Sequence, residues 1–201
     1  MMIFVGLVFG SGKAGADNSK NTELFKNAQA LFQQHRDEQV ITMLAGPATD
    51  TPWDFELNNL YAKALLNQCV AYKKRNDTIY RDLVRRPYEI GVRLAKNSPG
   101  RPGPYYIIAR SLLINERPQK AMANIQKAVQ LTGSFHQDWY LYMEALGDCW
   151  SAKIGSDSKA RGEARKAYKA ALASNRGDHE FQKSIKQKLK KLNMKKKRKI
   201  K

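Results

Sequence analysis

Histidine and cysteine are scarce in this 201-residue chain, which contains three of the first and two of the second. His35, His136 and His179 fall in separate segments, without H-x-x-x-H spacing and without a cysteine partner. Zinc sites need clustered ligands, so we expect surface or helix-capping histidines and no metal. The sequence also lacks G-x-S-x-G and any other nucleophile–base motif. We therefore predict no catalytic residues, no cofactor and a protein that is not an enzyme.

A hydrophobic run long enough to span a bilayer is also missing. The apolar stretch at 3–9 is far shorter than the roughly 20 residues that a transmembrane helix needs. An A-x-A sequence follows at 14–16, which is typical of a secretory signal peptide cleaved before Asp17. We predict a signal peptide at 1–16 and a periplasmic or secreted protein. The alternative is an uncleaved arm on a cytoplasmic protein, because no Lys or Arg precedes the apolar run.

Acidic residues are absent from the C-terminal end of the chain. Eleven of the 36 Lys and Arg residues lie at 183–201, where there is no Asp or Glu. The other 182 residues therefore carry only +7 of the net charge of +18. We predict a disordered polybasic tail at 193–201, since charge blocks of this kind are usually mobile arms. Contacts with an anionic surface are assigned to Lys195, Lys196, Lys197, Arg198, Lys199 and Lys201.

The remaining sequence is helical in pattern and shows no β-type alternation of useful length, so we expect an all-α fold. Apolar residues recur at helical spacing from Thr22 onward. Asp178 is the expected N-cap of the last helix. The clearest of the earlier helices are expected at about 104–116, 119–132, 136–154 and 158–174.

Prolines are expected to set several helix boundaries. Pro47 should end a short helix, because proline lacks an N–H donor. Pro52 should lie in the first turn of the next helix. A helix at about 78–97 should kink or split at Arg86, the residue before Pro87.

Two copies of a helix-pair pattern carry the strongest signal in the chain. The first copy consists of Tyr105, Ile108, Ala109, Leu112, Ala121, Ile125 and Ala128. The second consists of Met143, Leu146, Gly147, Trp150, Ala164, Tyr168 and Ala171, with an insertion at 154–158. Both resemble the tetratricopeptide repeat, in which small residues let neighbouring helices approach and large residues fill the gaps. The clearest repeats span 102–132 and 139–175.

Two earlier copies match the family less well. The first uses Leu24, Ala28, Leu31, Val40 and Leu44, and Pro47 falls where the family has a small helical residue. The next uses Leu57, Leu60, Ala64, Tyr88, Val92 and Ala95, with extra residues between its halves. The resemblance implies a helical repeat domain at 17–192, built as a right-handed α-solenoid. A C-terminal capping helix would close it with Phe181, Ile185, Leu189 and Leu192.

The repeat register also predicts the state of the two cysteines. Cys69 and Cys149 fall on first helices that are two hairpins apart, roughly 20 Å at about 10 Å per helix contact. A disulfide needs Cα atoms within about 7 Å. We therefore predict two unpaired, buried thiols.

The family resemblance implies a concave groove, lined by the first helices, in which a partner binds. The positions on that face are Tyr106, Arg110, Leu113, Glu144, Asp148 and Ser151. Arg110 could accept a partner's carboxylate, whereas Glu144 and Asp148 make the neighbouring surface acidic. This mixture differs from an all-basic carboxylate clamp, so the ligand is left open. The tryptophans are interpreted as packing residues.

These features favour a non-enzymatic protein-interaction scaffold or adaptor in a bacterial envelope assembly. The tail would attach it to an acidic partner or to anionic lipid. One alternative is a nucleic-acid-associated repeat protein that binds through the tail. Another is an accessory subunit of an enzyme complex. The leader distinguishes the first two, because an exported protein rarely meets nucleic acid.

Overall fold

The computed structural model describes residues 14–133, 136–175 and 178–197, and this part of the chain is all-helical, as predicted. The predicted leader lies mostly outside these residues, apart from 14–16, which begin the first helix. The helices are α1 (Ala14–Gln33), α2 (Asp37–Asp50), α3 (Phe55–Lys74), α4 (Tyr80–Leu83), α5 (Arg85–Asn97), α6 (Pro102–Ile114), α7 (Pro118–Gln130), α8 (Trp139–Ala152), α9 (Ala160–Ser174) and α10 (His179–Lys197). Within the described ranges, no helix is long and apolar enough to cross a membrane.

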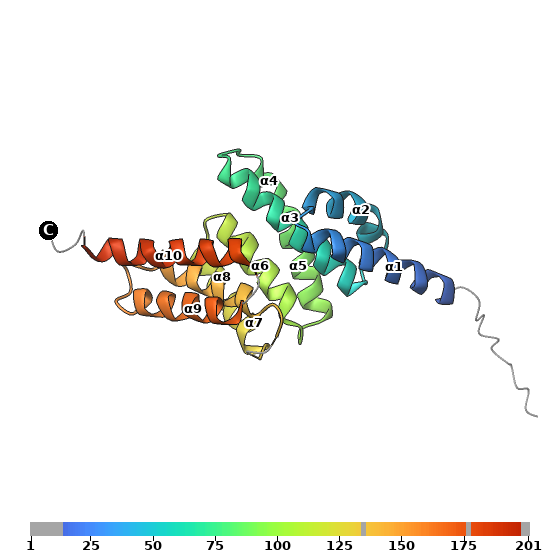
Figure 1. The fold of residues 1–201 in the computed structure, drawn as a ribbon. Helices are drawn as coiled ribbons and strands as arrows, with labels where there is room; N and C mark the ends of the chain where they lie inside the picture. Colours follow the sequence, from blue (N-terminus) through green and yellow to red (C-terminus); the bar gives the residue numbers. More distant parts are fainter. Residues whose placement is uncertain (1–13, 134–135, 176–177, 198–201) are drawn as a thin grey trace, which may run out of the picture.

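The helices form hairpins that pack one after another along the chain (Figure 1). The pairs are α1 with α2, α3 with α5, α6 with α7, and α8 with α9. First helices also contact one another across the pairs, in the order α1, α3, α6, α8. This inner row is what stacked helical hairpins require. The short helix α4 lies in the insertion of the second pair and projects from the stack in Figure 1.

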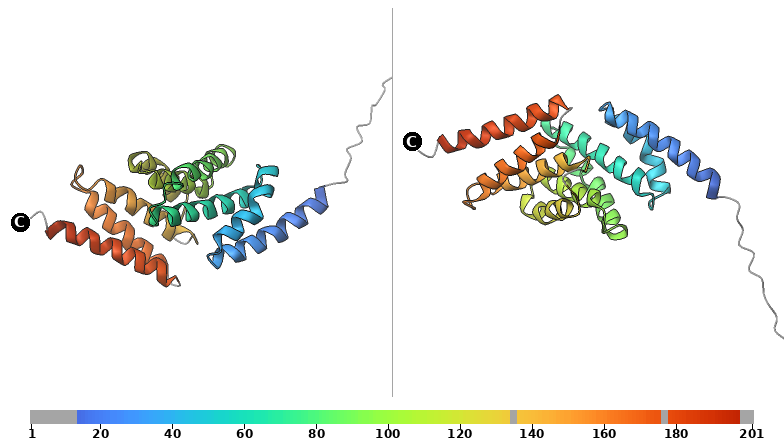
Figure 2. Two further views of the ribbon diagram at one scale, coloured as in Figure 1. Left: turned by 90° about the horizontal axis from the view of Figure 1, so that it is seen from above. Right: turned by 60° about the horizontal axis from the view of Figure 1, so that its bottom comes forward.

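The two ends of the stack approach each other. Both views in Figure 2 show the end of α1 close to the beginning of α10, on one side of the molecule. Between these ends, α1 packs on α2 and α3, whereas α10 packs on α9. The inner row therefore begins with α1, and α10 follows its last hairpin.

Two hydrophobic clusters hold the stack together. The main core runs from Ala28 in α1 to Cys149 in α8 without interruption. A smaller cluster beneath α10 consists of Ala164, Tyr168, Ile185 and Leu192. Ile185 and Leu192 lie on one face of α10, so the predicted capping stripe is confirmed. Because apolar burial is worth about 25 cal/mol per Å², the smaller cluster anchors α10 less firmly than the main core anchors the other helices.

Small residues sit where helices come closest, as the repeat pattern predicts. Ala109, Ala121 and Ala164 are fully buried at helix contacts. At Gly147, a Cβ atom would lie 2.4 Å from Cε1 of Tyr168, which is closer than packed atoms allow. The α8–α9 hairpin therefore depends on a residue without a side chain at this position.

Two expectations about prolines are wrong. Helix α2 continues through Pro47 to Asp50 and buries Ala48, although we expected it to end at Pro47. Loss of one N–H donor is tolerated there because Pro47 lies close to the C-terminal end of the helix, where the following turn still forms. Pro52 lies in a turn, and α3 begins later, at Phe55, with Asp54 as its N-cap.

The break before α5 occurs, but two residues earlier than expected. The chain divides at Val84, and Pro87 then lies in the first turn of α5. Backbone N–H groups in a first turn have no partner within the helix, so proline loses no bond there.

The C-terminal helix begins as predicted and extends further. The Asp178 side chain accepts a hydrogen bond from the Phe181 N–H at 2.9 Å, which confirms the N-cap. Helix α10 then continues to Lys197, so residues 193–197, which we predicted as disordered, are helical. Residues 198–201 lie outside the described part of the chain.

Both cysteines are unpaired and fully buried, as predicted from their places on α3 and α8. Burial raises the pKa of the Cys69 thiol to about 11. It also raises the pKa of Cys149, to about 12, with Asp148 adding to the effect. Both thiols therefore stay protonated at neutral pH and act as small packing residues.

Candidate functional site

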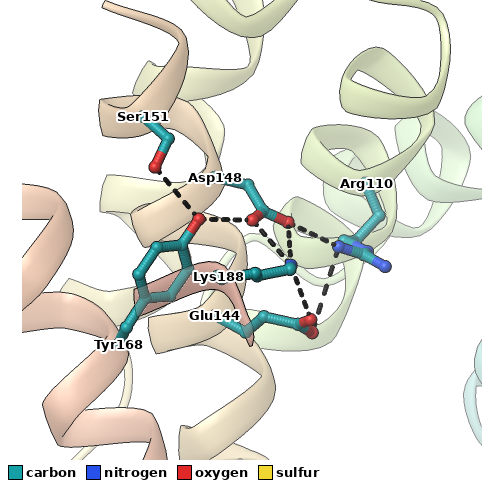
Figure 3. Close-up of polar contacts among 6 residues, drawn as sticks. All are labelled: Arg110, Glu144, Asp148, Ser151, Tyr168 and Lys188. Carbon is teal, nitrogen blue, oxygen red and sulfur yellow. Dashed lines mark hydrogen bonds and ion pairs between the residues drawn. The ribbon is translucent and has the colours of Figure 1, made fainter. Parts of the chain in front are cut away.

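Four of the six predicted groove residues come together on the inner row of helices (Figure 3). Arg110 lies on α6, and Glu144, Asp148 and Ser151 lie on successive turns of α8. We call these four, with Tyr168 and Lys188, the charged network. The other two predicted residues are not part of it. Tyr106 is buried against Tyr142, with ring centroids 5.2 Å apart, and Leu113 packs against the main core.

Lys188 of α10 is the centre of the network. Its Nζ lies 2.8 Å from Oε1 of Glu144 and 2.7 and 2.8 Å from the two carboxylate oxygens of Asp148. The ammonium also lies 5.6 Å from the centre of the Tyr168 ring. One lysine therefore bridges two carboxylates that α8 places four residues apart on the same helix face.

Arg110 approaches the same carboxylates from α6. Its Nη1 lies 3.3 Å from Oδ2 of Asp148 and 4.0 Å from Oε2 of Glu144. Two cations thus face two carboxylates, and the network is close to electrically neutral. The arginine that we expected to be available for a partner's carboxylate is paired with acids of its own chain.

Tyr168 connects the network to the α8–α9 hairpin. Its hydroxyl donates to Oδ1 of Asp148 at 2.7 Å, and Ser151 Oγ lies 3.1 Å from the same hydroxyl. Burial, together with the nearby Asp148 charge, raises the Tyr168 pKa, so the phenol stays protonated and donates. The hydroxyl fixes the orientation of the ring that packs on Gly147.

Electrostatics within the network favours the ionised carboxylate of Glu144. Burial raises the pKa of Glu144, but Arg110 and Lys188 outweigh it, and the result is below the ordinary value of 4.5. Burial also opposes the charge on Arg110, yet Glu144 and Asp148 help to keep its pKa above the usual range. Glu144 and Arg110 therefore stay charged at neutral pH, and the network acts as a positioning device between α6, α8 and α10.

Lys188 and Tyr168 were not identified as site residues from the sequence. Tyr168 was assigned to packing by the repeat pattern, which carries no information on its hydroxyl. Lys188 was one of eleven cations at 183–201. Its place between the buried Ile185 and Leu192 was the available signal, because it puts Lys188 near the inward face of an amphipathic helix.

A pocket of about 570 Å³ lies beside the network on the same inner row. Its walls come from the second half of α1, the first half of α3, the start of α6 and residues 136–142. The lining side chains include the aromatic residues Phe25, Phe32, Phe55, Tyr140 and Tyr142 and the carboxamides Gln29, Gln33, Asn59 and Gln137. No residue that we singled out for the groove lines this pocket.

The charged groups of the pocket are paired with one another. Lys63 Nζ lies 2.7 Å from Oδ2 of Asp138, and their side chains are only 14% and 19% exposed. Arg101 Nη1 lies 2.6 Å from Oε1 of Glu56, and the same guanidinium stacks 4.1 Å from the centre of the Phe55 ring. The pocket is thus close to neutral, and its remaining surface is aromatic and amide in character.

Helices α3 and α6 approach closely at Asn59 and Gly103, which both line the pocket. A Cβ atom on Gly103 would lie 2.6 Å from Oδ1 of Asn59. That oxygen is buried and has no hydrogen-bond partner among the described residues. An unpaired buried acceptor costs free energy, so the close approach of α3 and α6 here is not compensated by a hydrogen bond to this oxygen.

The residues predicted to contact an anionic surface lie at the C-terminal end of the chain. Lys195, Lys196 and Lys197 belong to this helix, and Arg198, Lys199 and Lys201 lie outside the described residues. Among described side chains, Lys183, Lys186 and Lys190 are exposed on the face of α10 that points away from its cluster. No group of three His, Cys, Asp or Glu residues in the described part of the chain could hold a metal ion.

Comparison with known proteins does not assign the chain to a family. No family model matches it, and no curated protein sequence does. One similar solved chain is described as "MamA RS-1 ArsTM double mutant", at 17% identity and a TM-score of 0.35, with 76% of this chain and 93% of that chain covered. Another comes from Bacteroides ovatus ATCC 8483 and is described as a proposed protein-binding protein, at 16% identity and a TM-score of 0.31, with coverage of 87% and 98%. Both are similarities only.

Proposed function

We propose that this protein is a non-enzymatic scaffold of the tetratricopeptide type, which holds another protein on its inner row of helices. The observation that carries this proposal is the pocket where α1, α3, α6 and α8 meet. Stacked hairpins create such extended inner surfaces because each pair contacts only its neighbours. The charged network stiffens the same row, so the surface is held ready before a partner arrives.

Site-specific photo-crosslinking tests where a partner docks. A photoreactive amino acid is placed at Gln33, an exposed pocket residue of α1, or at Gln126, an exposed residue of α7 outside the pocket. The full-length protein is then irradiated in its native host, and crosslinked proteins are identified by mass spectrometry. A partner captured from Gln33 and absent from Gln126 supports the proposal. Equal capture from both positions, or capture from Gln126 alone, contradicts an inner-face scaffold.

We further propose that the scaffold is exported and works in a bacterial envelope assembly. The support is the apolar stretch at 3–9 and the A-x-A sequence at 14–16. Intact mass of the protein produced from its full gene is the direct measurement. A mature chain starting at Asp17 is expected, whereas a mass that retains residues 1–16 would contradict export by this route.

The basic end is proposed to bind an anionic membrane surface. The seven residues at 195–201 contain six cations and no acid, and juxtamembrane cations contribute about 1 kcal/mol each to binding. Deleting 195–201 retains Asn193, whose side chain accepts a hydrogen bond from Arg165, so the fold should persist. We expect the deletion to reduce binding to vesicles containing anionic lipid by at least about tenfold at low salt.

Full-length protein on zwitterionic vesicles is the control for that measurement, and a duplex DNA probe tests the alternative. Unchanged vesicle binding after deletion would remove the tail from the proposal. Loss of DNA binding, with no measurable vesicle binding by either form, would favour the nucleic-acid alternative.

A further inference from the structure

One wall of the pocket combines aromatic and carboxamide side chains. Phe25, Gln29, Phe32 and Gln33 follow one another at spacings of four, three and one residue, which places them on one face of α1. The two phenylalanines are partly buried against the main core, and the two glutamines are exposed. This aromatic–amide stripe and residues 136–142 both line the pocket.

The charged side chains that line the pocket are already paired with one another. Lys63 pairs with Asp138, and Arg101 pairs with Glu56. His136 accepts a hydrogen bond at Nδ1 from the Asp138 N–H, at 3.1 Å. A carboxylate, phosphate or ammonium group entering the pocket would meet charges that the chain already neutralises, and it would lose part of its own hydration.

Carboxamides and rings, in contrast, suit an uncharged peptide. Each Gln or Asn amide both donates and accepts, so it can pair with a peptide N–H or C=O in either chain direction. Partly exposed rings gain from contact with another large apolar side chain, by stacking and by burial. A volume of about 570 Å³ lies within the usual range for ligand sites, roughly 300–1,000 Å³.

We propose that this pocket binds an uncharged protein segment that inserts a large apolar or aromatic side chain between α1 and residues 136–142. Carboxamides of Gln29, Gln33 and Gln137 hold the backbone of that segment. This inference rests on the proposed scaffold function and adds the chemistry of the partner. The two surfaces of the protein would then bind different ligands. The basic end would bind an anionic surface, and the pocket would bind an uncharged segment.

The test uses three fluorescent ten-residue peptides on the full-length protein. The neutral probe is SGSFNLFSGS, and the acidic and basic probes carry Glu or Lys in place of its four serines. At about 0.15 M salt, we expect the neutral probe to bind at least about fivefold more tightly than either charged probe. Tighter binding of the acidic or the basic probe would overturn the proposal, and so would failure of all three to bind.

A matched pair of variants assigns the binding to the pocket. Q29R places an unpaired cation on the α1 stripe, and Q126R makes the same change on the exposed face of α7. We expect Q29R to weaken the neutral probe at least about fivefold and to shift preference toward the acidic probe, with Q126R within about twofold of wild type. Equal effects of the two variants would place binding elsewhere.

The two proposals fail in different ways. If a partner is crosslinked at Gln33 but the neutral probe is not preferred, the scaffold function stands and the pocket chemistry is wrong. If the neutral probe binds as expected but no partner is crosslinked at Gln33 in the host, the pocket chemistry stands and the scaffold function is wrong.

Discussion

The two ends of the inner helical row differ in what covers their surfaces. At the C-terminal end, α10 supplies Lys188, whose ammonium neutralises two carboxylates of α8. At the N-terminal end, α1 packs on α2 and α3, and a pocket remains between it and residues 136–142. The first surface is closed by α10, whereas no helix in the described part of the chain covers the second.

The largest effect should come from filling the closest helix approach at the closed end. In G147A the new methyl group would lie 2.4 Å from the Tyr168 ring, which Asp148 and Ser151 hold in place. Overpacking outweighs the gain in helix propensity, so we expect a loss of about 2–3 kcal/mol in the free energy of unfolding. Denaturant unfolding followed by circular dichroism measures it.

G103A is the matched change at the open end. Its methyl group would meet the tip of the Asn59 side chain at 2.6 Å, and a flexible side chain can rotate away at lower cost than a packed ring. We expect a loss of less than about 1 kcal/mol. Equal losses for the two variants would show that the ends of the row are equally rigid, which contradicts the comparison.

Removal of the bridging cation should have the next largest effect. K188A leaves Glu144 and Asp148 with Arg110 as their remaining cation in the network. Since the lysine is partly exposed, we expect a loss of about 1–2 kcal/mol, below the cost of breaking a fully buried pair. K186A, on the exposed face of α10, should stay within about 0.5 kcal/mol of wild type. If K188A and K186A lose similar amounts of unfolding free energy, the charged network does not contribute to the docking of α10.

The smallest expected effect is a dependence on pH. The pKa of Glu144 is lowered in the folded protein from its ordinary value of 4.5. Its contribution to stability is therefore complete above about pH 4.5 and disappears as pH falls through the lower, folded value. Between about pH 6 and pH 3.5, the unfolding free energy of wild type should fall more steeply than that of E144Q.

The exposed Glu89, which pairs with Arg85, provides the control for that series. E89Q should keep the wild-type slope, because the pair is open to solvent at one surface of α5. A slope for E144Q equal to that of wild type would mean that other carboxylates carry the acid sensitivity.

Periodicity in the sequence was enough to predict most of the helices. The family resemblance then placed Arg110, Glu144, Asp148 and Ser151 on the inner face of α6 and α8, although it did not predict that they pair with one another. The buried cysteines followed from the same register. These predictions depend on residues close together in the chain, where a helix fixes their relation.

Features that depend on contacts between distant residues could not be predicted in this way. Lys188 reaches Glu144 across 44 positions, and Lys63 reaches Asp138 across 75. The spacing of residues within one helix carries no information about such pairs. Pro47 was misjudged for a related reason, because the burial of Leu44 and Ala48 in the main core adds to the tolerance of a proline near the helix end.

The small separate cluster holds α10 with fewer buried apolar residues than the main core supplies to the other helices. Cooperative units of a protein open with free energies set by what each unit buries, and α10 rests on Ile185 and Leu192 with partly buried neighbours. Undocking of α10 would break the Lys188 contacts and uncover Glu144 and Asp148, while the main core from α1 to α8 stays intact. The ion pairs of Lys188 thus help to keep these two acids covered by α10.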